Sequence, residues 1–370
     1  MKNSRIRVLI TGPSLQDQGG VANYYNAVYP RLTNEAISVD YLEIGSTHGR
    51  GRVMHTIIDQ VRFWRTLGRL DPHIVHLNPS LDLKSFLRDG VFIFLAKLRR
   101  RSILVFFRGW QEPFEIMVTG RFRWFFKLTY ARADCFVVLA KVFAERLRDW
   151  GITKPVHIGT TVVADELLNE LSIEKKVNSI LRAENIRLVY LARLERQKGI
   201  MELIAAVEIL LDRGVSLSLT IAGDGPLMSQ VRRRVATLGQ HQDKVTVVGY
   251  VRGLMKAEIL RSHHVYCLPT QYGEGMPNSV LEAMGMGMPV VTCPVGGIAD
   301  FFQNHKMGAL LETTEPNSMA NSIGSLIANR DNLATIATYN HSYARRHFLA
   351  STAAETLRAW YRNMDVFDEA

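Results

Sequence analysis

The sequence is poor in cysteine, and its three cysteines, Cys135, Cys267 and Cys293, lie far apart. Their spacing argues against a disulfide framework or a zinc site and suits a reducing compartment. Long apolar runs are also missing, because Gly and Pro interrupt the longest uncharged stretch, residues 283–299, whereas a membrane-spanning helix needs roughly 20 mostly apolar residues. The first residues contain no signal-peptide h-region, so we expect a cytoplasmic location.

The Asp-x-Asp signature is absent too, so the usual sequence sign of a divalent metal bridging a diphosphate is missing. Four histidines lie in pairs near predicted element ends, and we interpret them as strand-edge or helix-end residues rather than metal ligands: His73, His76, His263 and His264. We therefore expect neither a metal nor a bound cofactor.

The residues that are present indicate a globular protein with an uneven positive charge. The 370 residues are 47% hydrophobic and 22% charged, which suits two folded domains. Residues 1–176 hold 26 Lys and Arg against 17 Asp and Glu, whereas residues 177–370 hold 19 against 18. The N-terminal half is therefore expected to meet an acidic partner, such as a membrane surface, a phosphorylated acceptor or nucleic acid.

Short apolar segments alternate with amphipathic ones along both halves. Strands are predicted at residues 7–11, 38–42, 74–77, 103–107 and 135–139, and then at 188–191, 216–221, 245–248, 265–268, 290–292 and 309–311. The pattern predicts an α/β protein of two Rossmann-like domains with parallel sheets. A polar stretch, 165–185, separates the halves, so we expect domains at residues 1–165 and 186–345.

The most informative segment places two glutamates around the start of a predicted helix. Pro277 suits a first helical position, and the helix is expected to run from about Asn278. Its free N–H groups and positive dipole end favour an anion or sugar hydroxyls. Glu274 in the preceding loop and Glu282 inside the helix add acceptors for polyol hydroxyls. Ordinary helix capping and a solvated glutamate are the alternative interpretation.

Ligands of open parallel sheets bind at the carboxyl ends of the strands, where further informative residues occur. Arg193 and Lys198 follow the first strand of the second half, and two cations there can neutralise a departing diphosphate; a solvated basic loop is the alternative. Gly223 begins a tight turn after the next strand. Tyr250 and Val251 follow the third strand as a candidate platform for a nucleobase, with plain packing of Tyr250 as the alternative.

In this order the motifs resemble those of the retaining family-four glycosyltransferases, the glycosyl transferases group 1, whose GT-B fold has two Rossmann-like domains facing across a cleft. The resemblance covers most of the chain and is strongest over residues 187–312. Its elements are Gly19-Gly20-Val21, Arg193 with Lys198-Gly199, Gly223-Asp224-Gly225-Pro226, Gly249-Tyr250, the Glu274-to-Glu282 segment, and Gly296-Gly297 with Gly308.

The resemblance implies roles for the matching residues around a nucleoside-diphosphate sugar. Arg193 and Lys198 would bind the diphosphate, and Glu282 would bind the ribose hydroxyls. Glu274 would lie by the donor sugar and complete the catalytic set. The remaining donor-binding residues would be Gly19, Gly20, Gly223, Tyr250, Val251, Gly275, Met276, Pro277, Asn278 and Ser279. The last helix, within residues 350–370, would cross back onto the N-terminal domain.

Two departures from the family pattern concern the acceptor side. Many relatives carry His after the fourth N-terminal strand, whereas this chain has Arg108, which stays protonated but can bind an anionic acceptor or the leaving phosphate. Many also carry a Pro-Asn-Gly turn where this chain has His157–Thr161. Because no carboxylate is placed as a nucleophile, we expect a front-face reaction with retention, in which the leaving phosphate helps to deprotonate the acceptor hydroxyl.

The acceptor clue is a mixture of cations and aromatic or apolar residues in the N-terminal half, over 91–101 and 121–127. Such a face can lie on an anionic bilayer; a core helix with solvated arginines is the alternative. We therefore expect a metal-independent hexosyltransferase-type enzyme of bacterial-type surface polysaccharide synthesis, peripheral on the inner face of the membrane. It would move a sugar from a UDP-sugar, with GDP as second choice, to a glycan or polyprenyl-diphosphate-linked acceptor.

Three other functions stay open at this point. A nucleotide-sugar epimerase of the same fold would turn over a donor with no acceptor present. A catalytically weak GT-B scaffold subunit is favoured by the replaced His, while the retained donor motif argues against it. A nucleic-acid-binding protein is suggested by the pI of 9.6, but no recognised nucleic-acid motif supports it, so we expect no nucleic-acid partner.

Overall fold

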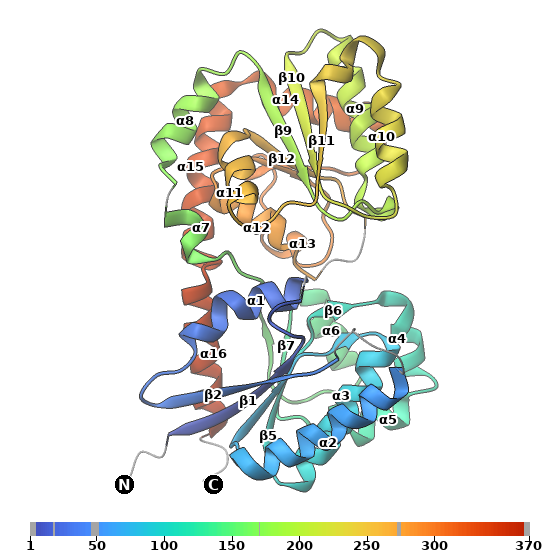
Figure 1. Ribbon diagram of the computed structural model, residues 1–370, viewed down its shortest axis with the longest axis vertical. Helices are drawn as coiled ribbons and strands as arrows, with labels where there is room; N and C mark the ends of the chain where they lie inside the picture. Colours follow the sequence, from blue (N-terminus) through green and yellow to red (C-terminus); the bar gives the residue numbers. More distant parts are fainter. Residues whose placement is uncertain (1–4, 18, 46–51, 170, 272–274, 366–370) are drawn as a thin grey trace. The chain divides into compact units, whose positions relative to one another are not determined.

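The computed structural model describes residues 5–17, 19–45, 52–169, 171–271 and 275–365. The chain divides into two compact units. Unit 1 comprises Met1–Val162, Gly273–Met276 and Ala350–Ala370, and unit 2 comprises Val163–Tyr272 and Pro277–Leu349. Each unit contains a six-stranded sheet in which every pair of neighbouring strands is parallel (Figure 1). The two Rossmann-like halves predicted from the sequence are therefore confirmed.

Unit 1 is built on a sheet with the strand order β2-β1-β3-β5-β7-β8. The strands are β1 Ile6–Gly12, β2 Ile37–Glu43, β3 Ile74–Leu77, β5 Ser102–Phe106, β7 Cys135–Val138 and β8 Val156–Ile158, and a separate pair is formed by β4 Ser80–Leu81 and β6 Gly109–Trp110. The helices are α1 Gly20–Val28, α2 Arg52–Leu70, α3 Leu83–Leu98, α4 Glu112–Thr119, α5 Arg123–Leu128, α6 Lys141–Asp149 and α16 Ala350–Asp365.

The central strands of unit 1 have continuous apolar sequences because both of their faces are buried. Every residue of β3, β5 and β7 is buried, as expected for parallel strands covered on both faces. The edge strand β8 has only three residues, none of them buried, and the sequence pattern missed it for that reason. Helix α2 packs against α3, α3 against α5, and α5 against α4, so these four helices form one continuous layer.

Unit 2 is built on a sheet with the strand order β11-β10-β9-β12-β13-β14. The strands are β9 Ile186–Leu191, β10 Leu217–Ala222, β11 Val245–Gly249, β12 Val265–Leu268, β13 Val290–Thr292 and β14 Gly308–Leu310. The helices are α7 Asp165–Asn169, α8 Ile173–Leu181, α9 Ile200–Asp212, α10 Met228–Ala236, α11 Gly253–Ser262, α12 Asn278–Gly285, α13 Ile298–Phe301, α14 Pro316–Ala328 and α15 Arg330–His347.

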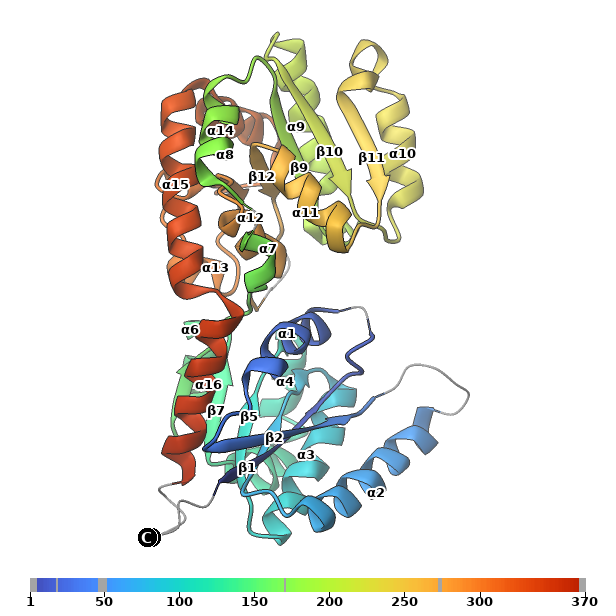
Figure 2. The same ribbon diagram turned by 60° about the vertical axis from the view of Figure 1, so that its left-hand side comes forward.

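The polar stretch between the halves is helical and belongs to unit 2. Residues 165–169 and 173–181 form α7 and α8, and α8 lies alongside α15 in both views (Figures 1 and 2). Ile180 is fully buried, and Lys176 is buried with its ammonium donating to the carbonyls of Leu260 and Arg261, both at 2.8 Å, near the end of α11. A lysine thus faces inward within the polar stretch that was expected only to separate the two halves.

The last helix completes unit 1 rather than unit 2. Helix α16 packs on α1, β1 and β3, and Tyr361 within it is fully buried. Its hydroxyl lies 2.6 Å from Nδ1 of His76 on β3. Within the described ranges, no helix is long and apolar enough to cross a membrane.

Candidate functional site

The loops at the carboxyl ends of the unit 2 strands are tied together by backbone hydrogen bonds. Three of these bonds connect segments that follow or end neighbouring strands of the sheet: Gly223 N donates to Gly249 O at 2.7 Å, Leu194 N to Asp224 O at 2.9 Å, and Gln271 N to Gln197 O at 2.9 Å. The loops after β9, β10, β11 and β12 therefore form one continuous rim. These hydrogen bonds fix the positions of the four loops, and of the side chains on them, relative to one another.

Glycine is required where the loops of this rim cross most closely. Gly223 has φ of 153°, and a Cβ there would lie 1.9 Å from the carbonyl oxygen of Ala192. Gly199 has φ of 72°, and a Cβ would lie 2.3 Å from the carbonyl oxygen of Pro269. Any side chain at either position meets backbone, which cannot move aside cheaply. The turn predicted at Gly223 therefore keeps the first two loops in contact.

Arg193 and Lys198 lie in the loop after β9, as predicted. The Arg193 side chain is 73% exposed and forms an ion pair with Glu195 at 3.0 Å. Breaking such an exposed ion pair to admit a ligand costs little free energy. Lys198 is half-buried, and burial lowers its pKa to about 8, with Glu195 acting against the shift and Arg193 adding to it. An anion arriving at this loop would therefore favour the charged form of Lys198.

Helix α12 begins at Asn278 as predicted, but Pro277 precedes the helix instead of occupying its first turn. Pro277 is the N-cap, and its extended ψ of 117° keeps it outside the helix. The Tyr266 hydroxyl oxygen fixes this end of the helix, because it lies within hydrogen-bond distance of both Ser279 Oγ, at 2.6 Å, and Leu191 O, at 3.0 Å. Asn278 Oδ1 is buried and accepts no hydrogen bond from any residue that the structure describes. An unused acceptor thus lies at the start of α12.

Glu282 is neither a solvated residue nor an isolated carboxylate. Its Oε1 accepts from Lys256 Nζ of α11 at 2.7 Å, and the two side chains are only 13% and 23% exposed. Lys256 orients the carboxylate that the resemblance assigns to ribose binding. Sequence reasoning missed Lys256, although its place one turn into the helix that follows β11 puts it beside the same rim.

Tyr250 and Val251 differ in their surroundings although they are adjacent. Tyr250 is 54% exposed at the end of β11, as a stacking platform requires, and plain packing does not describe it. Val251 is buried and contributes to the core. Only Tyr250 therefore presents a face that a base could reach.

The other predicted donor residues belong to unit 1 or are not described. Glu274 lies outside the described residues. Gly275 and Met276 belong to unit 1, where Met276 O accepts from Thr161 Oγ1 at 3.2 Å. Gly19 is the N-cap of α1 and Gly20 its first residue, both exposed.

Arg108 lies after β5, where its backbone N–H donates to Pro79 O at 2.8 Å. Its guanidinium carbon lies 3.7 Å from the ring centre of Tyr24 and 4.1 Å from that of Phe106. Cation–π contacts of this kind hold the side chain in place without neutralising it. The described ranges contain no group of three or more His, Cys, Asp or Glu side chains placed to hold a metal ion.

Comparison with known proteins agrees with this geometry. The family model described as glycosyl transferases group 1 matches residues 185–329, and the glycosyl transferase 4-like domain matches residues 4–158. The chain is 38% identical over 118 residues to the putative teichuronic acid biosynthesis glycosyltransferase TuaC of Bacillus subtilis, covering 32% of this chain and 27% of that protein.

Two further similarities cover more of the chain. It is 28% identical over 277 residues to the putative colanic acid biosynthesis glycosyltransferase WcaL of Escherichia coli, covering 73% of this chain and 64% of that protein. The matches to TuaC and WcaL thus span less than two thirds of those proteins' own length. The crystal structure of Anabaena Alr3699/HepE with UDP and glucose superposes with a TM-score of 0.73 over 97% of this chain and 100% of that one, at 16% identity. That likeness shows a shared fold.

Proposed function

Because this chain belongs to the glycosyl transferases group 1, we propose that it transfers a sugar from a UDP-sugar to a glycan or lipid-linked glycan, with retention at the anomeric carbon, in bacterial-type surface polysaccharide synthesis. The observation that carries the proposal is the rim of unit 2. There a cationic loop, an acceptor that no described residue uses, and a half-buried carboxylate held by a lysine lie on loops and helices that are joined to one another. UDP is preferred to GDP because HepE of the same fold was solved with UDP.

Each group has a role in this reaction. Arg193 and Lys198 bind the diphosphate and neutralise the charge that develops as it leaves. Glu282, oriented by Lys256, accepts hydrogen bonds from the ribose hydroxyls, and Tyr250 stacks on the base. The bond from the anomeric carbon to the β-phosphate oxygen breaks while the acceptor oxygen attacks from the same face. The acceptor proton passes to the departing phosphate.

Calorimetric titration with UDP, GDP and ADP tests the donor site. We expect UDP to bind, and Glu282→Ala and Lys198→Ala each to weaken binding by about tenfold or more, the cost of one charge-assisted hydrogen bond. Glu258→Ala and Lys244→Ala are matched controls, because both side chains are largely exposed members of surface ion pairs. If no nucleotide binds, or if the controls weaken binding equally, the donor assignment is wrong. An inverted product anomer would exclude retention.

The proposed membrane partner is supported by the outer surface of α2, α3 and α5, called here the α2–α3–α5 face. Large apolar side chains recur every three or four residues along α3 and are exposed: Leu83, Leu87, Val91, Phe94 and Leu98. Their neighbours on α2 and α5 add Ile57, Ile58, Val61, Trp64, Trp124 and Leu128. Exposed apolar stripes on packed neighbouring helices are unusual for a surface that meets only water.

The charges of this face have one sign. The only acidic residues in the three helices are Asp59 and Asp89, and both are buried. The exposed charges on these helices are all basic: Arg62, Arg65, Arg69, Lys84, Arg123 and Lys127. Apolar side chains flanked by cations suit the headgroup region of an anionic bilayer, which would bring the enzyme to a lipid-linked acceptor.

Vesicle flotation tests the membrane partner. We expect binding to phosphatidylcholine vesicles only when they contain phosphatidylglycerol, and loss of binding as salt is raised. Leu98→Glu and Trp124→Glu should lower binding, whereas Leu254→Glu on α11, where the native side chain is 85% exposed, serves as the control. Equal binding to neutral vesicles, or an equal effect of the control, would exclude this face.

A further inference from the structure

Arg108 carries a charge that nothing in the described part of the chain neutralises. None of the ion pairs in these ranges includes it. Its Nη1 is buried and donates no hydrogen bond within the same ranges. Leaving such a donor unused costs about 1–3 kcal/mol, and more when the group is charged. The side chain as a whole is only partly buried, so a ligand can approach it from solvent.

The described His and Tyr residues next to Arg108 supply no countercharge. His76 is fully buried, and burial, aided by Arg108, lowers its pKa to about 3, which leaves the ring neutral. Burial raises the pKa values of Tyr24, Tyr25 and Tyr361, so their hydroxyls stay protonated. The same cluster contains a second unused polar atom, Thr11 Oγ1, beside Asn78, whose side-chain amide donates to Thr11 O at 2.9 Å.

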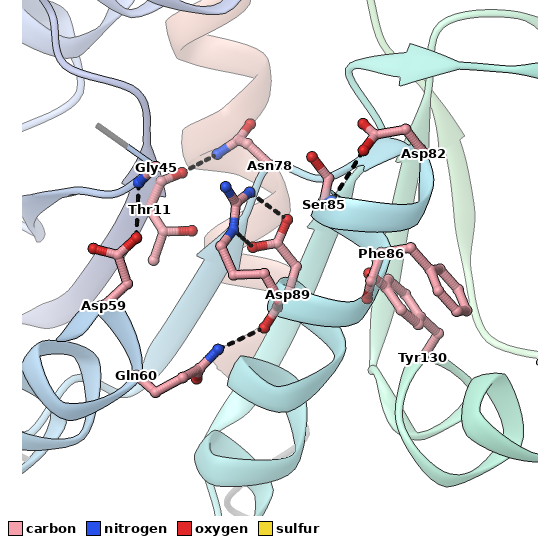
Figure 3. A network of polar contacts seen from close by, with 11 residues as sticks. Thr11, Gly45, Asp59, Gln60, Asn78, Asp82, Ser85, Phe86, Asp89 and Tyr130 are labelled. Atoms are coloured by element: carbon pink, nitrogen blue, oxygen red, sulfur yellow. Dashed lines mark hydrogen bonds and ion pairs between the residues drawn. The ribbon is translucent and has the colours of Figure 1, made fainter. Parts of the chain in front are cut away.

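A second arginine of unit 1 shows how the chain neutralises a guanidinium that has a structural role. Arg88 on α3 donates from Nε and Nη2 to the two carboxylate oxygens of Asp89, at 2.9 and 2.8 Å. Figure 3 shows Asp89 with its guanidinium partner. The nearby side chains of Asp59, Gln60 and Asn78 form hydrogen bonds with residues other than Asp89. Every side-chain oxygen of Asp89 is used there. Arg108, by contrast, contacts aromatic rings and has no ion-pair partner among the described residues.

We propose that Arg108 binds an oxyanion of the acceptor, either a sugar carboxylate or a phosphate ester. The inference rests on the proposed function and names the chemical class of acceptor that unit 1 takes. Cation–π contacts with the rings of Tyr24 and Phe106 hold the guanidinium in place, and its planar fork can bind a carboxylate or phosphate through two parallel hydrogen bonds. Lysine, a compact cation without that plane, would bind the same oxyanion less well.

Side-chain NMR of 15N-arginine-labelled protein tests this assignment, with the Arg108 resonances identified by their loss in Arg108→Gln. The probes are methyl β-D-glucuronide, phenyl phosphate, neutral methyl β-D-glucoside, and UDP. We expect one of the two anionic probes to shift the Arg108 signals and to bind about tenfold or more tightly than the glucoside. The stronger of the two identifies a glycan carboxylate or a lipid phosphate as the source of the oxyanion.

Variants separate this proposal from the proposed function. Arg108→Gln should abolish the preference for the anionic probe, Arg108→Lys should retain part of it, and Arg132→Gln, which removes an exposed cation of the same unit, should leave it unchanged. UDP should bind all variants alike. If Arg108 responds to no probe, or only to UDP, the acceptor assignment is overturned while the donor site stands. If the wild-type protein fails to bind UDP, the proposed function is wrong.

Discussion

The pKa of Lys198 predicts how donor binding depends on pH. Burial lowers this pKa to about 8, so a lysine that would stay charged in water loses its proton as the pH rises through that value. A diphosphate favours the charged form, so above pH 8 the protein must take up a proton when it binds. Affinity for UDP should therefore fall as the pH rises above 8.

The size of the effect follows from the protonated fraction. About nine tenths of Lys198 is charged one pH unit below its pKa, and about one tenth is charged one unit above it. The dissociation constant should therefore rise about tenfold between pH 7 and pH 9, with an uptake of about half a proton at pH 8. The phosphates of UDP are already ionised in this range, because the second pKa of a phosphate ester is about 6.

Calorimetry in two buffers of different ionisation enthalpy measures both the affinity and the proton uptake. Lys198→Arg keeps a cation that does not deprotonate, so its affinity should stay flat from pH 7 to 9. A wild-type curve without slope, or a Lys198→Arg variant with the same slope as wild type, would show that Lys198 does not meet the diphosphate. Lys198→Ala should bind weakly at every pH.

Three further substitutions test other parts of the structure. Asp89→Ala should lower the free energy of unfolding by about 3–5 kcal/mol in urea, because it leaves a buried guanidinium unpaired, whereas the exposed Asp71→Ala should cost less than about 1 kcal/mol; equal losses would contradict the argument. Gly223→Ala should cost at least about 2 kcal/mol more than Gly239→Ala, which shares a positive φ but meets open space, and similar melting temperatures would rule out the close approach of the loops. Lys256→Gln should weaken UDP binding by about tenfold with little change in melting temperature; unchanged calorimetric affinity would remove its positioning role.

Local patterns were sufficient to predict much of the fold. The apolar strands of both sheets appear as runs because parallel strands are covered on both faces. Helix α9 follows the same rule, since the apolar residues at helical spacing in its sequence, Ile200, Leu203, Ile204 and Val207, are all buried. The start of α12 at Asn278 followed from Pro277, although the proline proved to be the cap.

Features that depend on distant partners could not be read in the same way. The pairing of Lys256 with Glu282 joins two helices across 26 residues of chain. The polar sequence of helix α8 includes the buried Lys176, whose partners are carbonyl groups more than 80 residues away in sequence. Arg108 was noted as a departure from a family pattern, but only the structure shows that its guanidinium contacts aromatic rings and forms no ion pair with any residue that the structure describes.

Helix α16 gives unit 1 an unusual folding order. Its Tyr361 meets His76 across 285 residues of chain, a contact of very high sequence separation. During synthesis, all of unit 2 leaves the ribosome before this helix does, so unit 2 can fold while unit 1 still lacks the element that covers β1 and β3. We expect the N-terminal half of a nascent chain to stay protease-sensitive until residues 350–365 have emerged, which pulse proteolysis of stalled chains would measure. The half of the protein that is made first is thus the last to mature.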